Sequence, residues 1–236
     1  MGAAIPVGGR LLGGLLSRAV PLERIRRAIG VLPQDRMVEG DCANALDATQ
    51  CNQCRLQHGM LLPARPRRAI RKETKINYDY QLFIANLRAG PERFSYVDKD
   101  SGALLSGFDF SIAARALNAL KGVQHPGPHQ LNVTEWFYNG VWFDGFWRSS
   151  CTVVDAKGRY AQFLDEDGVP QSGFQLDVVF GGLAAEAVRQ VGAISDAMPQ
   201  AKLEWHLMEL STYRYVKDIV PPPIITNYTP IPALKA

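Results

Sequence analysis

Long hydrophobic runs are missing from this sequence of 236 residues. No stretch of 18 or more uncharged apolar residues occurs, so no transmembrane helix is predicted. The first 20 residues are similar to a signal peptide only superficially, because they lack a basic start and Arg10 interrupts the apolar run. We therefore expect neither a membrane span nor a secretory signal.

The sequence also has few cysteines and a small net charge. Four cysteines are too few for a disulfide scaffold in a chain of this size. A net charge of +3 does not by itself indicate a nucleic-acid-binding protein. The composition is 47% hydrophobic and 21% charged, which is typical of a globular protein with a sizeable core. One large or two small domains are expected at this length.

The cysteines are unevenly distributed. Cys42, Cys51 and Cys54 form the spacing C-x8-C-x2-C-x3-H with His58. Four such ligands suit a structural Zn²⁺ site, although the usual finger spacing is not reproduced. Reduced thiols in a packed turn and a disulfide are the alternatives. Cys151 begins a predicted strand, where a core position is expected.

Positive charge is concentrated in "ARPRRAIRKETK", residues 64–75. The six cations of this run are Arg65, Arg67, Arg68, Arg71, Lys72 and Lys75. Charge runs mostly decorate segments that face solvent, so a solvated linker is one interpretation. The alternative is an arm that contacts phosphate groups.

The pattern of turns and periodic segments divides the chain into three parts. Residues 1–71 form an irregular N-terminal extension that holds one expected helix, 21–32, and the Cys-rich turn. Residues 72–220 form the main domain, and the Pro-rich residues 221–236 form an extended tail.

Within the main domain, helices and strands alternate. Residues 75–87 fit a strand and a helix equally. The other expected elements are a helix at 108–122, three short strands between 131 and 157, a helix at 174–195, a strand at 201–210 and a helix from Ser211, its N-cap, to 220. This order predicts an α/β (α+β) fold with a mixed central sheet of about four strands flanked by helices.

Asn139-Gly140 lies between two aromatic-rich runs and is a strong hairpin signal. A two-residue loop sets the register so that Glu135 faces Asp144. Directly opposed residues have Cβ atoms about 4.5–5.5 Å apart, and two like charges there destabilise a hairpin unless something lies between them. A divalent cation with oxygen ligands meets that need.

The third strand, "CTVVDAK", adds a second pair of charges. Its alternation places Asp155 and Lys157 on one face. If this strand pairs with the second, Asp155 joins Asp144, and the acids and the lysine converge at one end of the sheet. The alternative is an ordinary ion pair at a strand end.

These residues resemble the active-site pattern of the PD-(D/E)xK nucleases, with an acid late in a second strand and acid-x-Lys in a third. The fuller string "EWFYNGVWFDGFW…CTVVDAKGRYAQF", followed by "LEWHLMELSTYRYV", resembles the restriction endonuclease fold toxin 5 family over roughly residues 50–220. This family comprises toxic domains of bacterial polymorphic toxins and type VI secretion effectors. The resemblance implies a restriction-endonuclease-like core.

The resemblance also implies roles for the site residues. Asp144 and Asp155 would bind Mg²⁺ or Mn²⁺, Lys157 would be catalytic, and Glu135 would be a fourth member that completes the metal shell or accepts a proton. The acid of the triplet is Asp155, where glutamate is more usual in the family. The shorter side chain shifts the expected metal geometry.

Three polar residues outside this set are candidates for contacts with nucleic acid. They are Arg159, Gln162 and Arg214, for each of which solvent exposure is the simpler interpretation. Arg159 and Gln162 follow the acid-x-Lys triplet directly, and Arg214 lies on the last expected helix.

The function implied by the resemblance is that of an antibacterial toxin, a metal-dependent DNase that acts in target cells. A cognate immunity protein is implied as a partner, with a secretion chaperone or delivery-spike protein as a further one. The toxin would be made in the bacterial cytoplasm, leave without a signal peptide and act in the cytoplasm of the target cell. The alternative is a non-enzymatic module that binds nucleic acid or protein on a nuclease-like fold.

Overall fold

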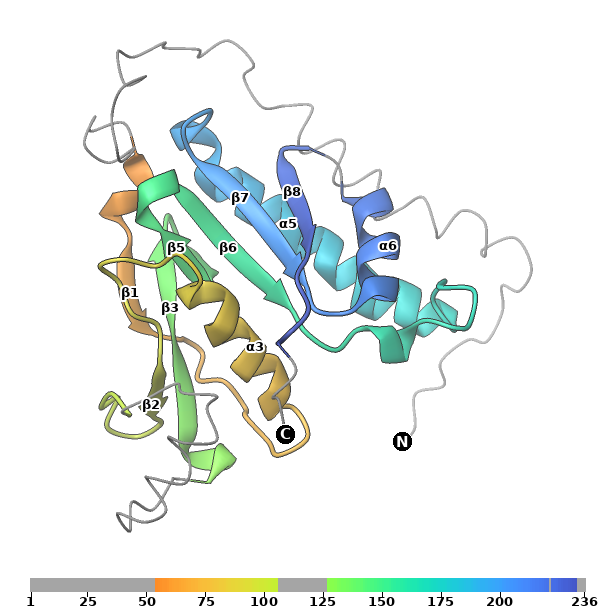
Figure 1. The fold of residues 1–236 in the computed structure, drawn as a ribbon, viewed down its shortest axis with the longest axis horizontal. Coiled ribbons are helices and arrows are strands. Elements are labelled where there is room, and N and C mark those ends of the chain that lie inside the picture. Colours follow the sequence, from red (N-terminus) through yellow and green to blue (C-terminus); the bar gives the residue numbers. More distant parts are fainter. Residues whose placement is uncertain (1–53, 106–126, 221, 233–236) are drawn as a thin grey trace, which may run out of the picture.

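The computed structural model of the protein describes residues 54–105, 127–220 and 222–232 (Figure 1). The expected helices at 21–32 and 108–122 lie outside the described residues. The strands are β1 (Met60–Pro63), β2 (Tyr96–Asp98), β3 (Leu131–Tyr138), β4 (Val141–Phe143), β5 (Gly145–Trp147), β6 (Thr152–Lys157), β7 (Lys202–Leu207) and β8 (Ile224–Tyr228). The α-helices are α3 (Lys75–Asn86), α5 (Gly181–Ile194) and α6 (Leu210–Ile219), and the π-helical segment Gln175–Phe180 leads into α5.

The strands form two four-stranded sheets. In the first sheet, β3 pairs antiparallel with β1, β2 and β4. The second sheet has the order β5-β6-β7-β8, in which β5 and β6 are antiparallel while β6, β7 and β8 are parallel. The predicted mixed α+β fold is confirmed, and the strands are shared between two sheets.

Helices cover both faces of the second sheet (Figure 1). The helix α3 packs on one face so closely that a Cβ at Gly145 would lie 2.7 Å from the Cα of Ala85. The helix α5 covers the other face, where its buried residues Leu183, Ala187 and Val191 join the main core. Residues 75–87, which fitted two patterns, are therefore helical because the sheet offers α3 a surface to cover.

The hairpin register predicted from Asn139-Gly140 is confirmed. Tyr138 pairs with Val141, Phe137 with Trp142 and Trp136 with Phe143. Asn139 and Gly140 both have positive φ, at 47° and 80°. These left-handed conformations are those a type I′ turn requires, and asparagine and glycine adopt them most easily.

The two ends of the described chain are more ordered than the sequence predicted. Residues 60–63 form β1 on the edge of the first sheet, and residues 224–228 form β8 on the edge of the second. The expected tail therefore begins with a sheet strand, because Pro221, Pro222 and Pro223 precede β8 rather than interrupt it. β1 lies before the boundary expected at residue 72 and pairs with β3, while the division into three parts stays a prediction.

One local prediction is wrong, because the N-cap of α6 is Glu209 and not Ser211. Of the three alternatives for the cysteines, the structure has the disulfide at Cys54, which is bonded to Cys151 with a Cα–Cα distance of 5.5 Å. The Cys54 thiolate is therefore not available to a zinc ion. Of the other expected zinc ligands, His58 is exposed, and Cys42 and Cys51 lie outside the described residues.

One helical segment, Gln175–Ala197, is long and apolar enough to cross a membrane by length and composition alone. An 18-residue window of this segment has a mean hydropathy of 1.2, and 44% of that window is buried inside the fold. Core helices of globular proteins pass the same test, and Phe180, Leu183 and Ile194 of this segment lie in the core. The expected absence of a membrane span stays a prediction.

Candidate active site

Asp144 lies at the bend where the second predicted strand passes from one sheet to the other. The preceding residue, Phe143, ends β4 in the first sheet, and the following residue, Gly145, begins β5 in the second. Continuing the β3–β4 register by one step brings Asp144 level with Glu135. Continuing the β5–β6 register by one step brings it level with Asp155, so Asp144 stands between an acid of each sheet.

A short hydrogen bond fixes the Asp144 carboxylate. The backbone N–H of Ala156 donates to Asp144 Oδ2 at 2.6 Å. Among the described residues, the second oxygen, Oδ1, accepts no hydrogen bond. Burial raises the pKa of Asp144 well above its ordinary value, and the negative charges of Asp155 and Glu135 raise it further. The site therefore surrounds a carboxyl group that has a free oxygen with negative charges, which favour its protonated form when no cation is bound.

Lys157 lies within a carboxylate cluster that is made up of Asp144, Asp155 and Glu186. Its Nζ lies 2.7 Å from Asp155 Oδ1 and 2.6 Å from Glu186 Oε2, and 4.3 Å from the ring centre of Trp205. Burial alone would lower the pKa of Lys157, but Asp155 and Glu186 raise it above its ordinary value. Lys157 is therefore a fixed positive charge at neutral pH.

Two residues of α5 complete the cluster, and the sequence reasoning missed both. Gln190 donates from Nε2 to Asp155 Oδ2 and accepts at Oε1 from Trp205 Nε1 at 2.7 Å. Glu186 lies one turn before Gln190, so the two side chains share a helix face. The available signal was this polar pair at spacing i, i+4 in a helix otherwise rich in alanine, glycine and valine.

Glu135 has different partners. Arg68 binds it with two parallel bonds, Nε to Oε1 at 2.9 Å and Nη2 to Oε2 at 2.6 Å, and Gln81 donates to Oε1 at 3.0 Å. Burial alone would lower the pKa of Arg68, but the bond to Glu135 raises it above its ordinary value. In this structure the charge of Glu135 is thus paired with Arg68, and its role toward a metal ion stays a prediction.

The carboxylates fit a divalent cation at Asp144 and Asp155. Asp144 has a free oxygen and an excess of neighbouring negative charge, which a hard cation would compensate. Both oxygens of Asp155 have partners, the neutral amide of Gln190 and the ammonium group of Lys157. Within the described ranges, no three His, Cys, Asp or Glu side chains are already grouped as a metal site.

The three candidates for nucleic-acid contact are exposed, and they differ in their surroundings. The backbone N–H of Arg159 donates to Asn77 Oδ1 at 3.0 Å, which holds the turn after β6 against the start of α3. The Gln162 side chain donates to the carbonyl of Arg159 at 3.2 Å and closes the next turn. Arg214 lies on the exposed face of α6. Arg159 is therefore the candidate whose backbone is held in place next to the end of β6.

In this fold, Asp144 lies beside an acid-x-Lys triplet on the neighbouring strand, an arrangement similar to that of the PD-(D/E)xK nucleases. Residues 119–210 match the model of the restriction endonuclease fold toxin 5 family, which confirms the resemblance noted from the sequence. The matched range contains β3 to β7 and every residue of the carboxylate cluster. No curated protein matches the chain. The match supports a toxin with a nuclease-like fold.

Proposed function

We propose that the protein is an antibacterial toxin that hydrolyses phosphodiester bonds of DNA with the help of a divalent metal ion, Mg²⁺ or Mn²⁺. The observation that carries the proposal is the position of Asp144 at the bend between the sheets, level with Asp155 and beside the triplet lysine. The family match to a restriction endonuclease fold toxin supports the nuclease class.

Asp144 and Asp155 would hold the metal ion. When bound, such an ion polarises a phosphoryl oxygen and lowers the pKa of a coordinated water. Lys157 stays protonated, because its pKa is raised, so it cannot serve as a general base. Its role is to place a fixed positive charge beside the negative charge that develops on the phosphate. Glu186 and Gln190 keep Lys157 and Asp155 in position.

Plasmid cleavage tests the proposal. The wild-type protein is expected to cut plasmid DNA with Mg²⁺ or Mn²⁺ and to leave it intact with EDTA. Asp144→Asn and Lys157→Ala should each reduce the cleavage rate by about 10²-fold or more, the scale for loss of a group that stabilises transition-state charge. RNA in parallel reactions assigns the substrate. Intact plasmid with every metal, together with equal survival of cells that express wild type and variants, would remove the nuclease proposal.

One observation favours the alternative, a non-enzymatic module that binds nucleic acid. Lys157 has a side chain only 4% exposed, and Asp155 already bonds to two protein groups. Binding of DNA without cleavage, unchanged by Asp144→Asn, would establish this alternative.

The partners and the place of action follow from the toxin assignment. A nuclease toxin endangers the cell that makes it, so we infer a cognate immunity protein. We also infer a secretion chaperone or delivery-spike protein that carries the toxin from the producing cytoplasm to the cytoplasm of the target cell. Co-expression with neighbouring genes, with survival as the readout, identifies the immunity protein.

A further inference from the structure

We propose that residues 64–74, the basic arm, form a docked surface that binds backbone phosphates of DNA and leads the strand to the carboxylate cluster. The inference rests on the proposed function for its substrate class. It assigns the basic run a binding role, whereas a solvated linker would have none.

The core holds the basic arm in place. Ala64 and Ile70 are buried, at 0% and 2% exposure. The Asn132 side chain on β3 accepts a hydrogen bond from the Arg68 backbone N–H at 3.0 Å and donates to the Ala64 carbonyl at 3.1 Å. At its far end, Thr74 Oγ1 accepts from the Arg71 backbone N–H at 3.0 Å. A merely solvated linker does not need these attachments.

The same backbone path turns four cations outward. Arg65, Arg67, Arg71 and Lys72 are exposed. Among the described residues, Asp100 is the single carboxylate paired with any of them, at 3.3 Å from Arg67, and both side chains of that pair are more than half exposed. Exposed pairs of this kind contribute little, so the four cations are available to a polyanion.

Arg68 connects the basic arm to the active site. Its side chain is 34% exposed, and its fork binds the buried carboxylate of Glu135. Glu135 lies one step beyond the Trp136–Phe143 pair and is therefore level with Asp144, so the guanidinium that binds Glu135 lies next to the carboxylate cluster. In agreement, the charge of Asp144 contributes to the raised pKa of Arg68. Glu135 therefore serves as the anchor of the basic arm.

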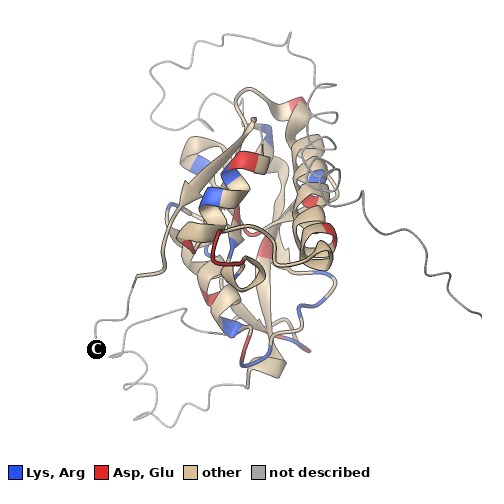
Figure 2. Ribbon diagram, turned by 90° about the vertical axis from the view of Figure 1, so that its right-hand side faces the viewer, with Lys and Arg blue, Asp and Glu red and all other residues tan. Residues whose placement is uncertain are grey.

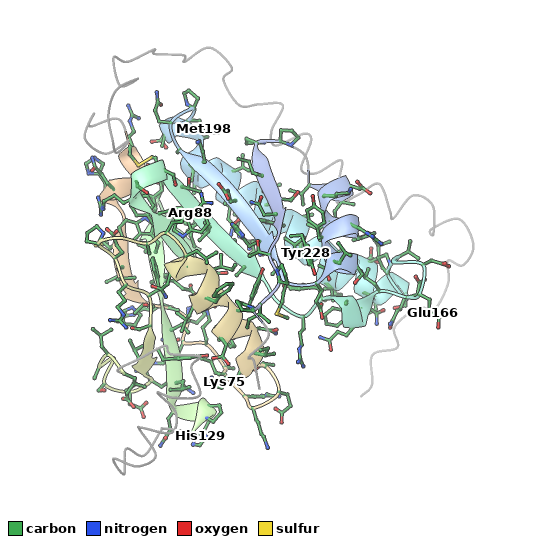
Figure 3. All side chains as sticks on the ribbon, viewed as in Figure 1. Lys75, Arg88, His129, Glu166, Met198 and Tyr228 are labelled. Carbon is green, nitrogen blue, oxygen red and sulfur yellow. A yellow bond between two sulfur atoms is a disulfide. The ribbon has the colours of Figure 1, made fainter. Side chains whose placement is uncertain are left out.

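The turn after the catalytic triplet lies at the same end of the molecule. Asn77, in the first turn of α3, binds the Arg159 backbone, and a Cβ at Gly158 would lie 2.5 Å from Asn77 Oδ1. Lys75, at the end of the basic run, is labelled at the lower end of α3 in Figure 3, and Figure 2 shows blue coil segments at that end. Exposed Arg159 thus extends the basic surface toward Lys157.

The chemistry of the site explains the need for such a surface. The cluster carries the carboxylates of Asp144, Asp155 and Glu186, which repel a phosphate backbone in the absence of a cation. Clustered lysine and arginine side chains attract that backbone by releasing its counterions. The ligand class is therefore a phosphodiester backbone, and sequence readout is not required.

Binding without cleavage tests the basic arm. A fluorescein-labelled duplex of about 20 base pairs is titrated in EDTA with wild type and with Arg65→Ala/Arg67→Ala/Arg71→Ala/Lys72→Ala, at roughly 50 to 200 mM salt. If each cation meets one phosphate, the slope of log affinity against log salt should fall by about 3 to 4. The affinity in low salt should fall by at least about tenfold.

A matched variant removes the same charge elsewhere. The quadruple change Arg55→Ala/Arg93→Ala/Lys202→Ala/Lys217→Ala neutralises four exposed cations outside the basic arm. It should keep a slope near that of wild type. Equal losses in the two variants, no loss in the arm variant, or no binding by wild type would each overturn the inference. If wild type cleaves plasmid DNA and the arm variant binds DNA normally, the inference about the basic arm fails while the nuclease proposal stands.

Glu135→Gln separates docking from net charge. This change removes a negative charge, so net charge alone predicts tighter binding of DNA. Loss of the Arg68 anchor predicts weaker binding and faster amide hydrogen exchange at Arg68. Arg68→Lys, which keeps the charge but not the fork, should weaken binding in the same way. Tighter binding by a folded Glu135→Gln protein would refute the docking role.

Discussion

Asp144, the proposed metal ligand at the bend between the sheets, has an unfavourable charge environment. Its pKa is raised, so the folded protein binds the Asp144 proton more tightly than the unfolded chain does. The resulting contribution to stability is present at low pH. It is lost as pH rises from the ordinary aspartate pKa of about 3.9 through the raised folded value. A bound cation would favour the ionised form and oppose this loss.

Asp144→Asn should therefore stabilise the metal-free protein at neutral pH. The gain is about 1.4 kcal/mol for each pKa unit by which the folded value is raised, and asparagine keeps an acceptor for the Ala156 N–H. Mg²⁺ should stabilise wild type by about 2.7 kcal/mol at 100 times its Kd, and should not stabilise the variant. Thermal unfolding with and without Mg²⁺ across the pH range measures both effects.

Glu166→Gln provides the control, because Glu166 is an exposed acid labelled at the far right of Figure 3. It should respond to Mg²⁺ as wild type does. A Mg²⁺ shift that persists in Asp144→Asn would contradict the metal role assigned to Asp144.

For single residues, strand periodicity and the Asn139-Gly140 turn were enough to predict that Asp144, Asp155 and Lys157 lie close together. The Asn-Gly turn fixed the alignment of Asp144, and alternation placed Asp155 beside Lys157. The partners of these residues were not predictable in the same way. Glu186 and Arg68 lie far away in the sequence, and neither periodicity nor turn chemistry encodes a contact between a helix and a distant strand.

Between elements, the close approach of α3 to β5 determines how the chain crosses from one sheet to the other. A Cβ at Gly145 would lie 2.7 Å from the Cα and 2.8 Å from the Cβ of Ala85, and 2.9 Å from Val154. The Cα and Cβ of Ala85 cannot be moved away by a rotation of the side chain. Glycine next to Asp144 is therefore a condition for the bend that places the carboxylate.

Gly145→Ala should lower the free energy of unfolding by about 1–3 kcal/mol, the usual cost of overpacking a core. It should also slow plasmid cleavage, because α3 and the Asp144 bend are pushed apart. Gly192→Ala is the matched control, since no atom lies within 4 Å of a Cβ there and α5 gains helix propensity. Urea denaturation compares the two. Equal stability of Gly145→Ala and wild type would show that α3 moves without cost.

The sequence predicted helices and strands better than it predicted the edges of the sheets. The patterns for α5 and β7 were strong because their buried faces repeat at the helix and strand periods. Edge strands β1 and β8 are short and partly exposed, and prolines border them. Their strand conformation comes from pairing with β3 and β7, which local sequence does not report.

At the scale of the whole molecule, three features join the two sheets. Asp144 links them along the chain, and Trp136 of β3 stacks on Phe146 of β5 with ring centres 4.6 Å apart. The disulfide between Cys54 and Cys151 adds a covalent link, because Cys54 lies shortly before β1 and Cys151 directly precedes β6. Both cysteines are fully buried. The loop that this bond closes contains the whole basic arm, α3 and the β3–β4 hairpin.

Loss of this link should destabilise the protein without removing its site. The disulfide spans a sequence separation of 97 residues. A cross-link over such a loop is worth about 2–4 kcal/mol, which corresponds to roughly 5–15 °C in Tm for a chain of this size. Cys54→Ala/Cys151→Ala should show this loss, and Cys42→Ser/Cys51→Ser, which leaves the bond intact, should retain more of the wild-type Tm. Wild type reduced and refolded in dithiothreitol should melt near the first variant. Identical melting of oxidised and reduced wild type would mean that packing between the sheets is enough to hold them together.

Since the proposed place of action is a reducing cytoplasm, the reduced protein should still cleave DNA at a temperature below its lowered Tm.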